Sequence, residues 1–303
     1  MMGAEEKSLH KKIVSGEKIL LVQIKPPKGN NPDYVYSLAD TYRGKVSGCG
    51  VSDNQDAVGM SAIAAAYILS QKGIAPIIHM TARDRNRIAL ISDAIGAQAL
   101  GMTTILCTSG THQTLGQYAA AKSVFDIDAV HLLRALSTLH EEGSLIGEEK
   151  IPDLHPFFLG AVADPCADPL AMQIMRLEKK IAAGARFIIT APVFDCERFK
   201  LWWEAVTASG IHKKAAIITG IHCLTDNALA REYSQRRPSP CIPQKLLQRI
   251  SSHKEKEAQK QEGIRIAVET IKELSSYAGI QGFELGSDGD NKSILQVIEE
   301  SGL

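Results

Sequence analysis

The stretch HMTARDRNRIALISDAIGAQALGMTTILCTSGT, residues 79–111, sets the expected fold of this chain. It follows and overlaps an apolar run, residues 75–80, that is typical of a buried strand. After a polar cluster at residues 83–87, a helical pattern continues to Gly101, a residue type that commonly ends helices. A second strand-like run, residues 103–107, ends in polar residues. The order strand, polar turn, helix, strand predicts a parallel α/β architecture.

The same alternation continues along the chain. Strands are expected at residues 19–24, 45–51, 75–80, 103–107, 157–162, 186–190, 215–219 and 282–285. Eight strand–helix units of roughly 30 to 40 residues favour a (β/α)₈ TIM barrel over a doubly wound sheet, and no GxGxxG follows the first strand. We expect one domain over residues 1–303, with a less regular helical C-terminal part from about 226 to 303.

The composition narrows the class of protein. The 34 Lys and Arg residues balance the 34 Asp and Glu residues, which does not favour nucleic acid or an acidic membrane surface as partner. No apolar stretch approaches the roughly 20 residues of a membrane span, and the N-terminus lacks the apolar core of a signal peptide. The six cysteines show no CxxC or metal-cluster spacing. We expect a reduced, cytoplasmic protein without a metal site.

Polar residues at the strand ends are the candidate functional groups, because active sites of TIM barrels lie at the carboxyl ends of the strands. They are Gln23, Lys25, Ser52, Asp53, His79, Thr81, Thr108, Ser109, Thr111, Asp164, Asp168, Thr190, His222 and Glu284. Each also has a structural interpretation. Either Asp53 or Asn54 could cap the next helix, Asp164 and Asp168 could be caps, and a backbone carbonyl could satisfy His79.

The charged clusters leave two interpretations open. Arg83, Arg85 and Arg87 could form a solvated helix start, or could hold the phosphate of a cofactor. Lys179 and Lys180 would be solvated by default. No Ser-His-Asp order or metal-ligand spacing is present, so a hydrolase or metalloenzyme has little support.

Several segments together resemble the methylenetetrahydrofolate reductase family, most closely its short bacterial form. The segments are 26–29 (PPKG), 51–55 (VSDNQ), 79–81 (HMT), 83–87 (RDRNR), 92–93 (SD), Gly110, 126–128 (DID), 160–162 (GAV), 167–169 (ADP) and 176–185 (RLEKKIAAGA). They cover about residues 19 to 225 in order. The resemblance implies a flavin-dependent (β/α)₈ barrel that reduces methylenetetrahydrofolate to methyltetrahydrofolate, with FAD or FMN as cofactor and NAD(P)H or a partner subunit as electron donor.

The resemblance also assigns cofactor-binding positions. Ser52 stands where the family has a threonine near the flavin, and His79 stands at a flavin-contacting histidine. Ser109 and Gly110 would lie under the isoalloxazine ring, and Lys180 near the phosphate end. The remaining cofactor-side positions in the matching segments are Asp53, Asp126, Asp168 and Arg176.

Three substrate-side positions depart from the family. Gln23 replaces the glutamate thought to supply the proton that opens the folate's five-membered ring. Thr111 replaces an aspartate near the flavin and the pterin, and Ala191 replaces a glutamine that binds folate. Glutamine cannot transfer a proton as glutamic acid does, so Gln23 or a water would have to take over. The three changes together predict an altered substrate site.

Three functions therefore remain open. The first is a flavin-dependent methylenetetrahydrofolate reductase. The second is a diverged flavoprotein with another substrate or an electron-transfer role. The third is a non-redox binding barrel or methyl-transfer accessory protein. We also expect a homo- or hetero-oligomer, because Trp202 and Trp203 point about 100° apart on one helix and one could contact a second subunit.

Overall fold

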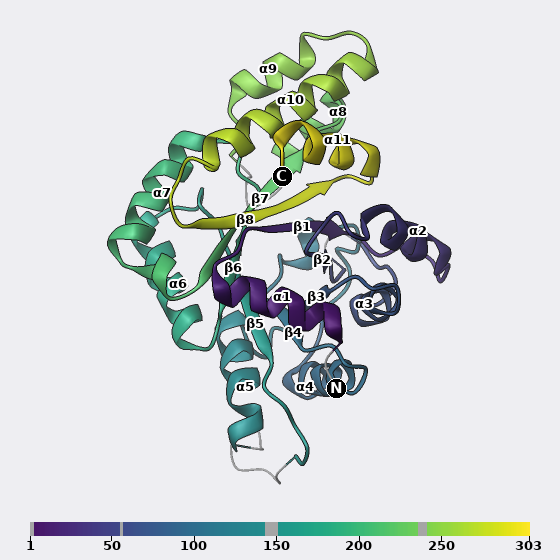
Figure 1. Cartoon of the computed structure of the whole chain (residues 1–303), viewed down its shortest axis with the longest axis vertical. Helices are drawn as coiled ribbons and strands as arrows, with labels where there is room; N and C mark the ends of the chain where they lie inside the picture. Colours follow the sequence, from purple (N-terminus) through teal and green to yellow (C-terminus); the bar gives the residue numbers. More distant parts are fainter. Residues whose placement is uncertain (1–2, 55–56, 143–150, 236–240) are drawn as a thin grey trace.

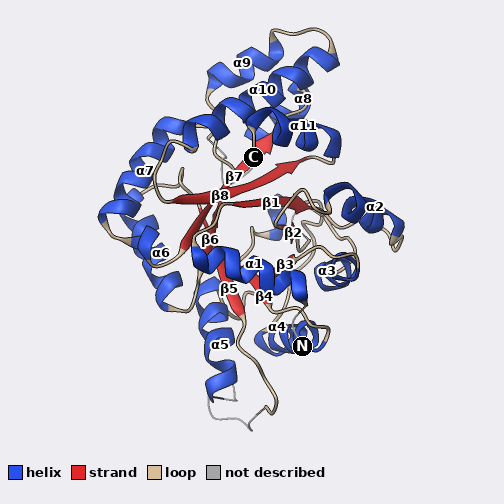
Figure 2. Cartoon of the chain, viewed as in Figure 1, coloured by secondary structure: helices blue, strands red, loops and turns tan. Residues whose placement is uncertain are grey.

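The computed structural model describes residues 3–54, 57–142, 151–235 and 241–303. Eight parallel strands pair in chain order and close into a barrel, β1 against β8, with helices on the outside (Figure 1, Figure 2). The predicted (β/α)₈ barrel is confirmed. Gln55, residues 143–150 of the expected loop before the fifth strand, and residues 236–240 lie outside the described residues.

The strands are β1 (Ile19–Ile24), β2 (Gly48–Val51), β3 (Pro76–Thr81), β4 (Thr104–Thr108), β5 (Phe158–Ala163), β6 (Phe187–Thr190), β7 (Ala216–Cys223) and β8 (Ile280–Ser287). The helices are α1 (Ala4–Ser15), α2 (Asp33–Tyr42), α3 (Ala62–Gln71), α4 (Arg87–Ala99), η1 (Gln113–Leu115), α5 (Ala129–Glu142), α6 (Leu170–Ala182), α7 (Cys196–Ala208), η2 (Ile211–Lys213), α8 (Asn227–Ser234), α9 (Gln244–Ser251), α10 (Lys256–Leu274) and α11 (Asn291–Ser301). The last two strands are longer than expected because they pair with each other as far as Cys223 and Ser287.

Helix α1 was missed by the sequence analysis, and it closes the amino-terminal end of the barrel. Its Leu9 and Ile13 are buried against residues of the barrel interior, including Leu21. The carboxylate of Glu6 accepts hydrogen bonds from the backbone N–H groups of Thr103 and Thr104 at 2.7 and 2.6 Å. In the sequence, this helix is indicated only by the spacing of Leu9 and Ile13, which are four residues apart in a segment that is otherwise mostly charged.

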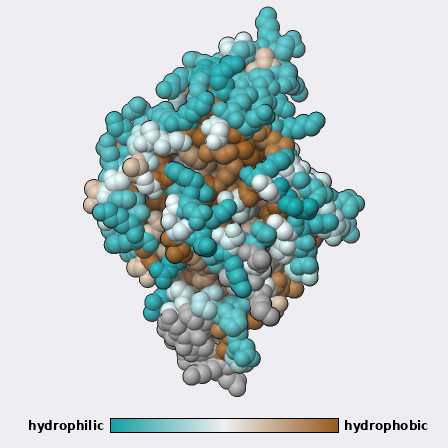
Figure 3. Space-filling view, viewed as in Figure 1, coloured by the Kyte–Doolittle hydropathy of each residue, from teal (hydrophilic) through white to brown (hydrophobic). Residues whose placement is uncertain are grey.

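The C-terminal part adds α8, α9 and α10 beyond β7, at the top of Figure 1. They enclose a separate apolar cluster that includes Phe194, Leu224, Tyr233 and Ile250. The face in Figure 3 is mostly hydrophilic, with hydrophobic residues showing chiefly in its recessed middle. Among the described helices, none combines the length and apolar character that crossing a membrane requires.

The expectation that Trp202 or Trp203 contacts a second subunit is wrong. Trp202 and Trp203 on α7 are both buried within the single chain, with 1% and 5% of their surface exposed. Trp203 stacks on Phe199 with ring centroids 6.1 Å apart, and a Cβ at Gly279 would lie 3.3 Å from its ring. Helix α7 is therefore covered on both sides by its own chain.

Candidate functional site

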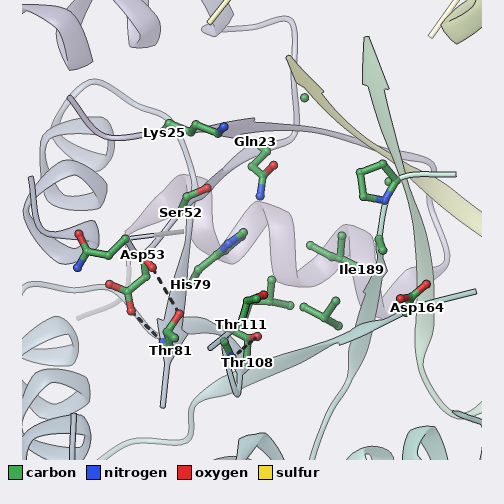
Figure 4. Close-up of a pocket in the computed structure, with 18 of the residues that line it drawn as sticks. Gln23, Lys25, Ser52, Asp53, His79, Thr81, Thr108, Thr111, Asp164 and Ile189 are labelled. Atoms are coloured by element: carbon green, nitrogen blue, oxygen red, sulfur yellow. Dashed lines mark hydrogen bonds between the residues drawn. The ribbon is translucent and has the colours of Figure 1, made fainter. Parts of the chain in front are cut away.

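A cavity of about 1420 Å³ opens at the carboxyl ends of the strands and is lined by residues of seven of them and by Ser52 directly after β2. Figure 4 shows Gln23, Ser52, His79 and Thr111 around one space, with Asp164 across it. The predicted site residues that line it are Gln23, Ser52, Asp53, His79, Ser109, Gly110, Thr111, Arg176, Lys180 and Ala191. Because small-ligand pockets usually hold about 300–1,000 Å³, this cavity has room for more than one ligand.

Two predicted cofactor residues lie outside the cavity lining. Asp126 accepts hydrogen bonds from Arg87, with Nε to Oδ2 at 2.8 Å, and these bonds lower the pKa of Asp126 to about 2. Asp168 pairs with Arg198 at 2.8 Å and its side chain is 73% exposed. Both aspartates therefore pair with arginines of the same chain and do not line the cavity.

The arginine run is engaged by protein groups. Arg83 is buried and donates to the carbonyls of Thr111 and Asn54 at 3.1 and 2.8 Å. Arg85 pairs with Asp53 and with Asp93. The expectation of a solvated helix start is therefore wrong for Arg83 and Arg85, and protein oxygens take the donors that a phosphate would need. These arginines hold the turns of β2, β3 and β4 together.

Asp53 is not a helix cap. Its Oδ2 accepts from the backbone N–H of Thr81 at 2.8 Å and from Arg85. Ser61 precedes α3 instead, without a side-chain capping bond. The expected cap role of Asp164 is also wrong, because Asp164 accepts from Cys166 N at 2.9 Å in the turn after β5.

The turn after β4 is closely packed at Gly110. Gly110 has φ +82°, and a Cβ there would collide with Thr81 and lie 3.0 Å from the Cβ of Arg83. The neighbouring Ser109 Oγ accepts from Ala129 N at 3.0 Å, which ties this turn to the start of α5. Only glycine fits at position 110, because φ is positive and Thr81 and Arg83 fill the space that a side chain would take.

Three buried polar atoms of the cavity have no hydrogen-bond partner among the described residues: Ser52 Oγ, His79 Nε2 and Glu284 Oε1. Burial lowers the pKa of His79 to about 4 and raises the pKa of Glu284 to about 8, so both side chains are neutral at pH 7. An unsatisfied buried polar group costs about 1–3 kcal/mol, which a ligand's hydrogen bonds would offset.

Lys180 lies at the inner face of α6 and lines the cavity, whereas Lys179 is exposed. Its Nζ donates to the carbonyl of Val162 at 2.6 Å, and burial followed by the charge of Arg176 lowers its pKa. The expectation that Lys180 is solvated is wrong. Arg176 and Lys180 lie one helical turn apart and give this side of the cavity a positive charge suited to phosphate.

The side of the cavity formed by β7, β8 and β1 has different chemistry. His222 lies 3.2 Å from Asp288 and stacks on Tyr233, with ring centroids 4.5 Å apart. Asp288 also pairs with Lys25 at 3.3 Å. Gln23 lies nearby, because its Oε1 is 3.5 Å from the position that a Cβ would take at Gly286.

Sequence relatives agree on one family. A family model described as methylenetetrahydrofolate reductase matches residues 8–302. A curated protein of Caenorhabditis elegans, a probable methylenetetrahydrofolate reductase (NADPH), is 24% identical over 255 residues, which are 82% of this chain and 36% of that protein. This chain thus spans little more than a third of that relative's length.

Two solved structures share the fold. An uncharacterized protein from Clostridium thermocellum that binds two copies of 5-methyl-5,6,7,8-tetrahydrofolic acid has a TM-score of 0.67 and 18% identity, with 97% of each chain covered. An F420-dependent secondary alcohol dehydrogenase in complex with an F420-acetone adduct has a TM-score of 0.55 and 14% identity, covering 94% of this chain and 99% of that one. At such identities the likeness shows the fold alone.

Proposed function

The chain belongs to the methylenetetrahydrofolate reductase family, and we propose that it binds a flavin and a reduced folate side by side and reduces methylenetetrahydrofolate to methyltetrahydrofolate. The observation that carries this proposal is the cavity itself, which exceeds the volume usual for one ligand and has two chemically different sides.

The residues on one side fit a flavin. Position 110, which the resemblance places under the flavin ring, accepts only glycine, and Ser52 Oγ and His79 Nε2 have hydrogen-bonding capacity that no described residue uses. Arg176 and Lys180 provide the cationic end for the phosphate of FAD or FMN. A bound flavin supplies the hydride for the one-carbon unit.

The residues on the other side support a folate site. Gln23, His222 and Glu284 place amide, imidazole and carboxyl groups beside a cavity wall of Ile189 and Ile221, a mixture suited to a pterin. The folate-binding relative from Clostridium thermocellum adds support, since its fold extends over 97% of this chain.

The test begins with the purified 303-residue chain. We expect FAD or FMN to be released on denaturation and identified by mass spectrometry, and 5-methyltetrahydrofolate to bind the folded protein in calorimetry. Mixing the oxidised protein rapidly with NADPH, then NADH, identifies the electron donor; a failure of both points to a partner subunit. Absence of either flavin binding or folate binding contradicts the proposal.

A second candidate function is a non-redox folate-binding or methyl-transfer accessory barrel. Gln23, Thr111 and Ala191 favour it, because the family's acid and two of its polar substrate groups are missing at these positions. It predicts folate binding without flavin. Flavin binding without folate binding would instead indicate a diverged flavoprotein with another substrate or an electron-transfer role.

A further inference from the structure

We propose that Glu284 is the proton donor to the bound folate, in place of the acid that the family has at the position of Gln23. This inference rests on the proposed function and adds a catalytic residue to it. Glu284 lies on β8, a strand to which the resemblance assigned no role, and its carboxyl lines the same cavity as Gln23.

The pairing of β8 with β1 brings Glu284 close to Gln23, which stands at the position of the family's acid. Strand β8 pairs with β1 so that Glu284 is opposite Leu21, and Gln23 is two residues further toward the mouth. At that next step β8 carries Gly286, which has no side chain. No side chain of β8 therefore stands between Glu284 and Gln23, and His222 Nδ1 borders this space at 3.3 Å from the position that a Cβ would take at Gly286.

A second glycine keeps room for the carboxyl group. A Cβ at Gly50 would collide with Glu284 Oε1 and lie 2.9 Å from His79 Nε2. The two polar atoms face the same gap, and neither has a hydrogen-bond partner among the described residues. A folate nitrogen or a water bound in this gap could satisfy both.

The surroundings keep the proton on Glu284. The titratable groups around Glu284 in the barrel are Cys49 on β2, neutral His79 on β3 and His222 on β7, and the Lys25–Asp288 pair lies at the mouth. No described residue forms an ion pair or hydrogen bond with Glu284, so burial dominates and favours the neutral acid. A carboxylic acid that keeps its proton at neutral pH is suited to general acid catalysis.

The proposed step combines a proton transfer from Glu284 with cleavage of one carbon–nitrogen bond of the folate. In methylenetetrahydrofolate the one-carbon unit bridges two nitrogens. Glu284 transfers its proton to the departing nitrogen as that carbon–nitrogen bond breaks, and the bonding electron pair stays on this nitrogen. The carbon, now an iminium with the other nitrogen, accepts the hydride from the bound reductant and becomes a methyl group. Solvent in the cavity returns a proton to the Glu284 carboxylate.

The test uses Glu284→Gln, which keeps the size of the side chain and a hydrogen-bond donor but cannot release a proton. The matched control is Thr219→Val, since Thr219 on β7 also has a buried hydroxyl without a partner among the described residues but does not line the cavity. In rapid mixing we expect both variants to accept electrons normally. Glu284→Gln should reduce the folate half-reaction by about 10²–10⁴-fold, as for loss of a general acid, and Thr219→Val should leave it unchanged.

An infrared measurement gives a readout independent of turnover. The difference between wild type and Glu284→Gln at pH 7 should contain the carbonyl band of a protonated carboxylic acid. Adding 5-methyltetrahydrofolate should shift this band, because the folate would become the partner that Glu284 lacks.

A double variant that moves the carboxylic acid to position 23 completes the experiment. Introducing Gln23→Glu into the Glu284→Gln protein should recover at least about tenfold of the lost rate, because Gln23 stands at the family's acid position. Failure to recover would mean that the loss in Glu284→Gln was structural, and would overturn the assignment.

Two further outcomes separate the inference from the proposed function. Folate binding that leaves the carboxylic band unmoved, together with a wild-type folate rate in Glu284→Gln, overturns the role of Glu284 while the reductase proposal stands. A wild-type protein that binds no reduced folate overturns the proposed function, and the role of Glu284 with it.

Discussion

Glu6 and Glu284 are two buried glutamates at different levels of the same barrel, with 3% and 7% of their surface exposed. Glu6, at the amino-terminal end, accepts from two backbone N–H groups and from the hydroxyls of Thr103 and Thr104. Glu284, below the open mouth, has no partner among the described residues. The satisfied carboxylate stabilises the fold, whereas the unsatisfied one is available to a ligand.

The packing around the two glutamates differs in the same way. Gly50 leaves room for the carboxyl group of Glu284, because a Cβ there would collide with its Oε1. At the closed end, Leu9 and Ile13 of α1 fill the barrel beneath Leu21. In TIM barrels the amino-terminal end generally supports stability and the carboxyl-terminal end supports function, and the hydrogen-bond state of the two glutamates follows that division.

The largest expected effect is on the pH dependence of stability. The folded pKa of Glu284 is raised from 4.5 to about 8, so the folded protein holds a proton that the unfolded chain releases as the pH rises from 4.5 to 8. The free energy of unfolding should therefore fall over this window, by about 1.4 kcal/mol per pH unit from this group and up to roughly 5 kcal/mol in all.

Glu284→Gln should lack this slope. Urea unfolding of both proteins at pH 5, 6, 7 and 8 should show the variant gaining stability relative to wild type as the pH rises, since all other titrating groups are shared. Parallel curves would mean that Glu284 is ionised in the folded protein and would contradict its role as a neutral acid.

The next effect concerns the satisfied glutamate. Glu6→Ala should lower the free energy of unfolding by about 2–4 kcal/mol, because it leaves the N–H groups of Thr103 and Thr104 buried without an acceptor. Glu5→Ala removes the same charge from an exposed position of α1 and should cost at most about 1 kcal/mol. Folate affinity should be unchanged in both. Equal losses of unfolding free energy in the two variants would show that Glu6 stabilises the protein through the charge of α1 and not through its hydrogen bonds.

The fold was predictable because strand–helix alternation is a local property, repeated eight times. The candidate site followed from it, since the carboxyl ends of parallel strands must share one mouth, and Gln23, Ser52, His79, Thr111 and Asp164 all line the cavity. The helix α1 was missed because two apolar residues among many charges give a weak amphipathic signal.

The contacts that each side chain makes could not be predicted in the same way. Whether Arg85 meets solvent, phosphate or Asp53 depends on contacts between residues 32 positions apart in the sequence. The same holds for Trp203, whose burial depends on Gly279. Glu284 stood among the strand-end candidates, but only the three-dimensional structure shows that it has no hydrogen-bond partner among the described residues.

Lys180 tests whether the difference between a satisfied structural group and a group available to a ligand also applies to a cation at the edge of the cavity. Its hydrogen bond to Val162 O leaves the ammonium group with further donors, and the nearby Arg176 makes an anion favourable. Lys180→Ala should therefore weaken flavin binding by about 1–3 kcal/mol through loss of a charge-assisted bond to phosphate. Lys179→Ala, the exposed neighbour with the same charge, should leave flavin affinity within about 0.5 kcal/mol of wild type. Fluorescence titration of both variants with FAD and FMN provides the measurement. If Lys180→Ala lowered stability but not flavin affinity, Lys180 would be a satisfied structural group like Glu6, and the phosphate would have to bind elsewhere.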